Sequence, residues 1–175
     1  GEIEIGETIK FGYFSQKGLT YKEDQRVIDF MKDIAEYYPL ANGKSISASQ
    51  FLKMFLFNEQ TQYTTISNLS GGERRRLYLI SVLFQNPNFL IFDEPTAVLT
   101  PSEIDELMAI MKNLVKEGKS IILITHKLDE IRAVSDRVTV IRRGKSIETV
   151  EIAGATNADL AEMMVGRSVS FKTEK

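Results

Sequence analysis

Two short groups of residues in this sequence have the types and spacing needed to handle a phosphate group. The first is Leu69-Ser70-Gly71-Gly72-Glu73, in which two adjacent glycines follow a serine. At the start of a helix, glycines let backbone N–H groups approach an anion without obstruction by a Cβ atom, and the helix dipole favours negative charge there. The same residues also describe an ordinary capped helix with Ser70 as the N-cap, and that alternative stays open.

The second group is the pair Asp93-Glu94, which directly follows the apolar run Phe89–Phe92. A carboxylate at the carboxyl end of a strand is suited to hold Mg²⁺, and the next carboxylate could orient or deprotonate a water that attacks a phosphate. Ligands of open α/β sheets bind at that edge. The alternative is a solvated acidic turn before Pro95.

Two single residues could join this chemistry. His126 directly follows the apolar run 121–125, and a neutral imidazole there could donate to a γ-phosphate oxygen. Gln16 follows an early β-favouring run and could contact a metal or a water through its amide oxygen. Their structural alternatives are a histidine that only supports the fold and an ordinary surface glutamine.

A parallel sheet would bring these groups together. The apolar runs 89–92 and 121–125 flank an amphipathic segment over 102–116, and a strand, helix and strand in this order predict parallel pairing. The remaining expected elements are one or two strands within 1–16, helical segments within 21–57, a helix over 68–84, a hairpin of 137–141 with 145–150, and a helix over 157–164.

Composition limits the function classes. The chain has 175 residues, 43% hydrophobic and 26% charged, with a formal net charge of −2, which suits one compact domain and excludes a global basic field for nucleic acid or anionic lipid. It has no cysteine and a single histidine, which excludes disulfides, thiolate metal sites and multi-histidine sites. No apolar run approaches the roughly 20 residues of a membrane span, so we expect no span and a cytoplasmic location.

Taken together and in this order, the motifs resemble the ATP-binding cassette (ABC) ATPases over almost the whole chain. The resemblance implies a P-loop NTPase-like α/β domain with a mainly parallel sheet and a small helical insert. It implies the following roles: Gln16 as the Q-loop glutamine and a metal contact, Leu69 to Glu73 as the nucleotide-binding signature motif, Phe89 to Asp93 as the Walker B strand with Asp93 at the metal, Glu94 as the general base, and His126 as the switch histidine.

The resemblance also implies ATP and Mg²⁺ as ligands and a head-to-tail pair of cassettes as the working unit. Ser70, Gly71 and Gly72 would then bind the γ-phosphate of ATP held on the opposite cassette. The domain division that it implies is a Q-loop region (1–20), a helical insert (21–67), a signature, Walker B and switch region (68–150), and a C-terminal helix and tail (151–175).

One part of the family pattern has no counterpart here. No segment matches the P-loop sequence G-x-x-x-x-G-K-S/T, because 118–120 and 43–45 carry Gly-Lys-Ser without the upstream glycine. We therefore expect the N-terminal P-loop portion of the cassette to be missing and the apolar faces of strands 89–92 and 121–124 to be exposed. The isolated chain should bind ATP weakly and hydrolyse it negligibly, and it should depend on a second cassette or another P-loop-containing partner.

The resemblance changes along the chain. Gly12–Gln16 and Ser70–Leu77 are similar to the ABC-F branch, whose soluble paired-cassette members act on the ribosome. Glu94–Pro101 and Met164–Arg167 are similar to nucleotide-binding subunits of bacterial sugar and nucleoside importers, which pair with a membrane permease. A chimera with its seam near Pro95 explains both. Three hypotheses follow: a Mg²⁺-dependent ATPase domain, a catalytically silent fragment that supplies only the signature face or a scaffold, and an engineered half-domain.

The triplet Arg74-Arg75-Arg76 follows the signature residues. In a helix these side chains spread over nearly a full turn, so at most two share a face. We expect a solvated helix face rather than a nucleic-acid contact.

Overall fold

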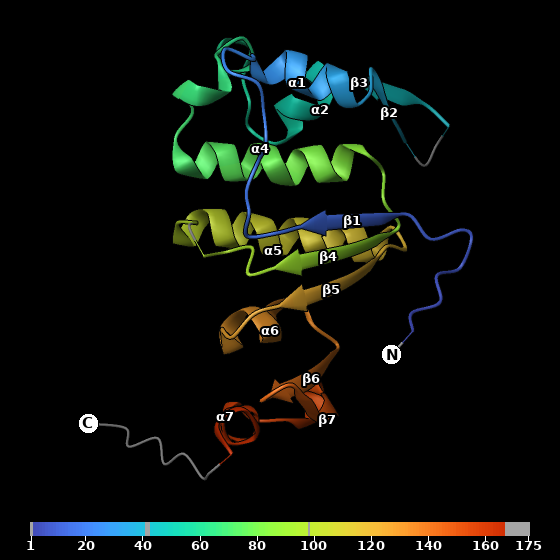
Figure 1. Ribbon diagram of the computed structural model, residues 1–175, viewed down its shortest axis with the longest axis vertical. Coiled ribbons are helices and arrows are strands. Elements are labelled where there is room, and N and C mark those ends of the chain that lie inside the picture. The colour runs from blue at the N-terminus through green and yellow to red at the C-terminus, as the bar shows by residue number, and fades with distance from the viewer. Residues whose placement is uncertain (1, 41–42, 98, 167–175) are drawn as a thin grey trace. The chain divides into compact units, whose positions relative to one another are not determined.

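The computed structural model describes residues 2–40, 43–97 and 99–166, and the chain divides into two units with the boundary after Ile124 (Figure 1). The first unit contains the sheet expected from the sequence. Its three strands lie in the order β1, β4, β5 and are all parallel: β1 is Phe11–Phe14, β4 is Phe89–Asp93 and β5 is Ser120–Ile124. This confirms the α/β fold with a parallel sheet.

Helix α5 (Pro101–Lys116) connects β4 to β5 and completes the expected strand, helix and strand. It begins with a capping box, because the Thr100 hydroxyl accepts from the Glu103 amide and the Glu103 carboxylate accepts from the Thr100 amide. It ends before Gly118, whose φ of 86° turns the chain into β5.

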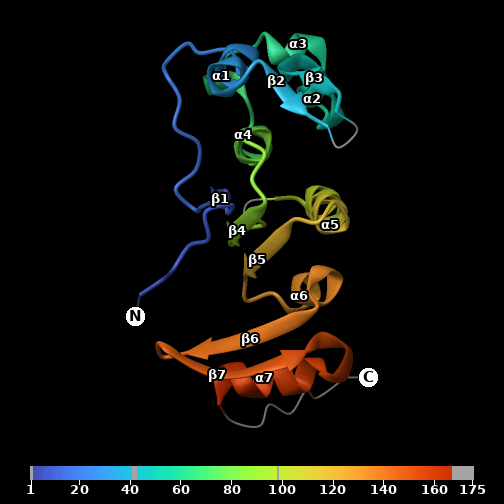
Figure 2. The ribbon, with the colours of Figure 1, turned by 90° about the vertical axis from the view of Figure 1, so that its right-hand side faces the viewer.

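Helix α4 (Gly71–Phe84) lies on the same side of the sheet as α5 (Figure 2). The core between these layers contains Phe14, Leu90 and Phe92 from the strands, each at most 1% exposed. A glycine at position 12 permits the close approach of α4, since a Cβ atom there would lie 2.9 Å from Val82 Cγ1.

The segment between β1 and α4 is the small, mainly helical insert that the sequence predicts, and it also contains a short hairpin. Its helices are α1 (Val27–Ile34), α2 (Ala48–Met54), α3 (Glu59–Gln62) and a short 3₁₀ turn η1 (Ile66–Asn68). Between them, β2 (Tyr37–Pro39) pairs antiparallel with β3 (Ser45–Ser47). The aromatic pair before Pro39 favours strand, and Gly43 supplies the positive φ of 76° that the turn needs.

Of the one or two strands expected within 1–16, the structure contains one, β1, and the described residues 2–10 form no strand. Ile3 is 87% exposed and Ile5 is 56% exposed. Alternation of apolar and polar residues makes a strand only where a neighbouring strand accepts its hydrogen bonds, and pairing with β4 begins at Phe11.

The second unit begins with α6 (Leu128–Val134) and contains the expected hairpin of β6 (Arg137–Arg142) and β7 (Lys145–Glu151). Arg143 and Gly144 both have positive φ, as a two-residue hairpin turn requires. A 3₁₀ turn η2 (Ile152–Gly154) leads to the last helix, α7 (Asn157–Val165), which is also as expected. The expected tail 173–175 and Arg167 lie outside the described residues. No described helix is both long and apolar enough to cross a membrane.

Candidate functional site

The signature residues form the capped amino end of α4. The Ser70 hydroxyl accepts a hydrogen bond from the Glu73 amide at 3.2 Å, and the Glu73 carboxylate accepts one from the Ser70 amide at 2.8 Å. This backbone hydrogen bond is the main reason that the pKa of Glu73 lies below its usual value. Leu69, the residue before the cap, is only 5% exposed and anchors this end of the helix in the core. The serine is therefore an N-cap, and the cap presents the first turn of α4 at the surface.

The two glycines of the signature have different surroundings. A Cβ atom added at Gly71 would meet no heavy atom within 4 Å, so this side of the helix start is open. A Cβ atom added at Gly72 would lie 2.6 Å from Oε1 of Glu103 on α5. Sequence reasoning assigned both glycines to phosphate binding, whereas close packing against α5 already accounts for the second.

The acidic pair lies at the carboxyl edge of the sheet. Asp93 is the last residue of β4, and the Glu94 amide donates to the carbonyl oxygen of Ile124 in β5 at 2.9 Å. Glu94 has a φ of 45°, in the left-handed region that non-glycine residues seldom adopt and that recurs at functional sites. The Tyr13 hydroxyl lies 3.5 Å from Asp93 Oδ2.

Gln16 lies at the same edge. It is exposed and follows the end of β1 by two residues, and β1 pairs with β4 so that Phe14 lies opposite Phe92. Because β1 and β4 are parallel neighbours, the residues that follow them emerge side by side. Gln16, Asp93 and Glu94 therefore lie at the same edge of the sheet.

His126 belongs to the second unit and follows β5 by two residues. It is exposed. The neighbouring Thr125 hydroxyl donates to the Glu130 carboxylate at 3.0 Å and accepts from the Lys127 amide at 3.2 Å. These bonds fix the backbone that carries His126 relative to α6.

Arg75 is a residue near the site that sequence reasoning missed. Its Nη1 donates to the carbonyl oxygen of Ser15 at 2.8 Å, and its guanidinium lies 4.0 Å from the centre of the Phe14 ring. The Tyr78 hydroxyl bonds to Ser15 as well, at 3.2 Å from the amide nitrogen. Two side chains of α4 therefore hold the residue directly before Gln16.

The arginine triplet is not the solvated face that we expected. Arg74 donates to the Leu69 carbonyl at 2.7 Å, and Arg76 forms an ion pair of 3.2 Å with Glu103. Burial lowers the pKa of Arg75, and the Nε atom of Arg75 is buried without a hydrogen-bond partner. Arg75 and Arg76 are held by groups 60 and 27 positions away, which periodicity alone does not reveal.

The oxygen atoms at this edge fit Mg²⁺ better than a transition metal. Asp93 offers a carboxylate and Gln16 an amide oxygen, and Mg²⁺ is usually held by one or two carboxylates together with phosphate oxygens and water. Within the described ranges, no cluster of three or more histidine, cysteine, aspartate or glutamate side chains could hold a metal by itself. A magnesium ion here would therefore need the oxygens of a nucleotide.

The Gly-Lys-Ser sequence at 118–120 is structural. Lys119 Nζ donates to Asn86 Oδ1 and to the Pro87 carbonyl oxygen, each at 2.9 Å. Gly118 follows a helix and precedes a strand, the reverse of the order in a phosphate-binding loop. This lysine holds the turn before β4 and does not face the carboxyl edge.

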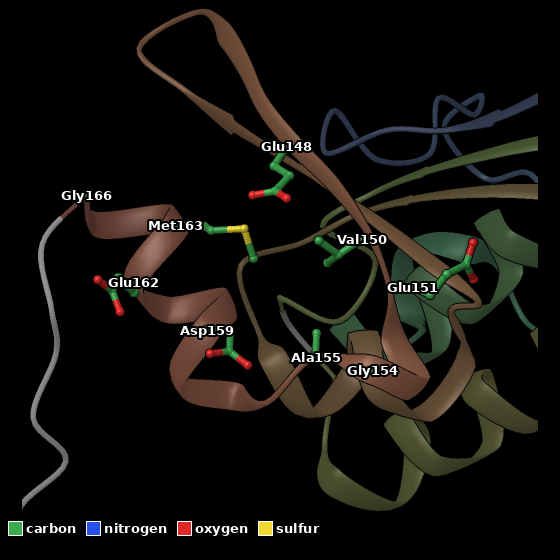
Figure 3. Close-up of a pocket in the computed structure, with 9 residues that line it drawn as sticks. All are labelled: Glu148, Val150, Glu151, Gly154, Ala155, Asp159, Glu162, Met163 and Gly166. Carbon is green, nitrogen blue, oxygen red and sulfur yellow. The ribbon is translucent and has the colours of Figure 1, made fainter.

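A cavity of about 710 Å³ in the second unit is unsuited to a nucleotide. Figure 3 shows that β7 and α7 contribute its acidic residues, and a lining without any basic side chain would repel phosphate. Its acidic residues are Glu148, Glu151, Asp159 and Glu162.

Comparison with curated proteins shows similarity to import ATP-binding proteins. The nucleoside import ATP-binding protein NupA of Lactococcus lactis is 69% identical over 110 residues, which are 63% of this chain and 22% of that protein. The xylose import ATP-binding protein XylG of Thermoanaerobacter pseudethanolicus is 33% identical over 168 residues, 96% of this chain and 30% of that protein. The chain therefore spans about a fifth to a third of the length of these relatives.

Comparison with solved structures supports the fold. An inward-facing ABC transporter of metal-chelate type has a TM-score of 0.71 at 16% identity, covering 95% of this chain and 67% of its own. A dimeric ATP-binding cassette in a post-hydrolysis state with ADP and phosphate has a TM-score of 0.66 at 21% identity, covering 84% of this chain and 65% of its own. Residues 6–97, more than half of the chain, match the family described as ABC transporter, and the chain therefore belongs to the ABC transporter family.

Proposed function

We propose that this chain is part of the ATP-binding cassette of an importer and that it presents its signature residues to ATP held by a second cassette. The open, capped amino end of α4 carries this proposal, since Gly71 leaves space for a phosphate beside the first-turn amides. Ser70 caps this turn, and Gly72 contributes its backbone to the same turn.

The carboxyl edge supports a second role in the same cassette. We assign Glu94 to orienting and deprotonating the attacking water, and Asp93 with Gln16 to holding Mg²⁺. When bound, the ion neutralises charge on the phosphate oxygens. For His126 the assignment as a γ-phosphate contact rests on the sequence motif alone. A complete cassette with Glu94→Gln should keep ATP binding and lose turnover, and unchanged turnover would contradict the assignment.

The chain alone should be catalytically silent. Asp93 and Glu94 add negative charge where a triphosphate would sit, and the lysine-bearing loop that neutralises such charge in P-loop proteins has no counterpart in this sequence. Titration calorimetry with Mg-ATP tests this directly. Micromolar binding by the unmodified chain would overturn it.

The importer branch is the better supported of the two resemblances. One importer protein is 69% identical over 63% of the chain, and another is 33% identical over 96% of it. The chimera of two cassette halves and the domain division rest on the change of motif resemblance along the chain. We propose a permease as the membrane partner and the cytoplasmic side as the location, and a ribosomal role has only the ABC-F resemblance to support it.

The signature assignment is tested by ATP-dependent association with a complete cassette, for which the Lactococcus lactis nucleoside import protein serves as the partner. Gly71→Asp places a carboxylate in the open space where the phosphate would lie, while Gly71→Ala adds only a methyl group. Sedimentation with Mg-ATP should show a complex for the parent chain and for Gly71→Ala, and none for Gly71→Asp. Equal association of both variants would refute the proposed contact.

A further inference from the structure

A cavity of about 810 Å³ in the first unit is lined by the insert on one side and by α5 on the other. Hairpin β2–β3 and the end of α2 supply the lining from the insert, and α4 contributes between them and α5. Helix α4 lies between the insert and α5 (Figure 2). Cavities that bind small molecules have volumes of about 300–1,000 Å³, so this one has the size of a ligand site.

Aromatic and aliphatic side chains form most of the lining. The rings of Tyr38 and Phe51 pack against each other with their centres 4.6 Å apart, and both line the cavity. Met54 is 65% exposed and Leu56 63% exposed, so these two lining residues border the opening. Leu56 also has a φ of 65°, a left-handed conformation that is costly for a branched residue and that recurs at ligand sites.

Two of the cations in the lining have a carboxylate beside them. Arg76 forms its ion pair of 3.2 Å with Glu103. Burial lowers the pKa of Lys119, and the negative charge of Glu117 acts against part of that shift. Both of these carboxylates line the cavity as well, so their charges are largely compensated where a ligand would lie.

The remaining charges in the lining are Arg75 and Glu106. Burial lowers the pKa of Arg75, while the charge of Asp93 acts in the opposite direction. Glu106 lies one turn after Glu103 on α5, and within the part of the chain that the structure describes its carboxylate has neither an ion pair nor a hydrogen bond. The cavity is therefore apolar and carries one uncompensated negative charge.

We propose that this cavity binds an aromatic organic cation. A flat apolar body would lie against the rings and leucines, and an amine would meet the Glu106 carboxylate. The faces of tyrosine and phenylalanine rings also attract cations, whereas an anionic ligand would be repelled by Glu106. This site involves no phosphate or Mg²⁺ contact, so it goes beyond the proposed ATP function and does not depend on it. A bound molecule would touch the insert and α5 together.

Three probes that share the dansyl fluorophore separate shape from charge in the unmodified chain. Dansylcadaverine carries an amine cation, dansylamide is uncharged, and dansylglycine carries a carboxylate. Dansylcadaverine should bind with blue-shifted emission and a dissociation constant on the order of 10 µM, as expected for a drug-sized ligand in a preformed cavity. Dansylamide should bind about threefold more weakly and dansylglycine at least about tenfold more weakly than the cation. Saturating dansylcadaverine should also raise Tm.

Two pairs of variants locate the binding site. Ala109→Trp places an indole in the cavity from the exposed surface of α5 and should abolish binding of all three probes, whereas Val115→Trp, outside the lining of the same helix, should bind as the parent does. Glu106→Gln should remove the preference for the cation and leave dansylamide binding unchanged. Asp105→Asn removes the neighbouring carboxylate, which is outside the lining, and should keep that preference.

Circular dichroism verifies that each variant folds, and the charge variants test the proposal independently of the tryptophan variants. No saturable binding of dansylcadaverine would overturn the proposal. Equal affinity for all three probes, or an unchanged preference in Glu106→Gln, would overturn the assignment of a cation. Binding retained by a folded Ala109→Trp would show that the probes bind elsewhere and would overturn the site.

Discussion

The two adjacent glycines of the signature should respond oppositely to the same substitution. At Gly72 an added methyl group would lie 2.6 Å from the Glu103 carboxylate, whereas at Gly71 it would meet nothing within 4 Å. The Glu103 carboxylate is not free to move aside, because it accepts from the amide and hydroxyl of Thr100, each at 2.9 Å, and pairs with Arg76 at 3.2 Å. Gly72→Ala should therefore break contacts that hold the start of α5.

The magnitude follows from the groups involved. Loss of the cap contributes about 1 kcal/mol, and loss of a largely buried ion pair about 0.5–1 kcal/mol. Replacing glycine by alanine within a helix stabilises the helix by up to about 1 kcal/mol, which offsets part of this loss. We therefore expect Gly72→Ala to lower the free energy of unfolding by about 1 kcal/mol, or Tm by about 2–4 °C for a chain of this size. Gly71→Ala should raise it by about 0.5 kcal/mol.

Urea unfolding followed by circular dichroism measures the free energy of unfolding of both variants. An unchanged dependence of that free energy on urea concentration shows that the unfolded states are comparable. In the background of Glu103→Ala, the penalty of Gly72→Ala should disappear, because the obstructing carboxylate has been removed. If Gly72→Ala is as stable as Gly71→Ala in the parent chain, the packing argument is wrong.

Three further predictions rest on single contacts. Gly12→Ala would place a Cβ atom 2.7–2.9 Å from three side-chain atoms and should destabilise the chain by about 1–3 kcal/mol, whereas Gly154→Ala, in open space, should not; thermal unfolding compares them. Arg75→Met should lose the hydrogen bond to the Ser15 carbonyl and speed amide exchange in the segment that leads to Gln16, and protection equal to that of the parent would show that this bond is unimportant. The pKa of Glu73 is lowered in the folded state, so the contribution of its carboxylate to folding stability is complete above the ordinary glutamate pKa of about 4.3 and is lost as the pH falls through the lowered value. Glu73→Gln should therefore reduce the loss of stability at acid pH, measured by unfolding at several pH values. An unchanged acid dependence would contradict this.

Local signals in the sequence predicted the elements that carry the candidate site. The start of α4 at Ser70 depends on bonds between residues three apart, and the strands at 89–93 and 120–124 depend on continuous apolar runs. Such interactions lie within one element, so the residues themselves specify them. The shared edge position of Gln16, Asp93 and Glu94 could also be predicted, because neighbouring parallel strands end at the same edge of a sheet.

Other features depended on contacts between distant parts of the chain. The absence of a strand within residues 2–10 and the division after Ile124 had no distinct signal in the residue pattern. The packing of Gly72 against Glu103 and the hold of Arg75 on Ser15 join residues 31 and 60 positions apart. Periodicity and capping describe a segment in isolation, whereas these contacts exist only once helices and strands pack against one another. The tertiary structure alone therefore decides which glycine has open space beside it and which arginine is buried.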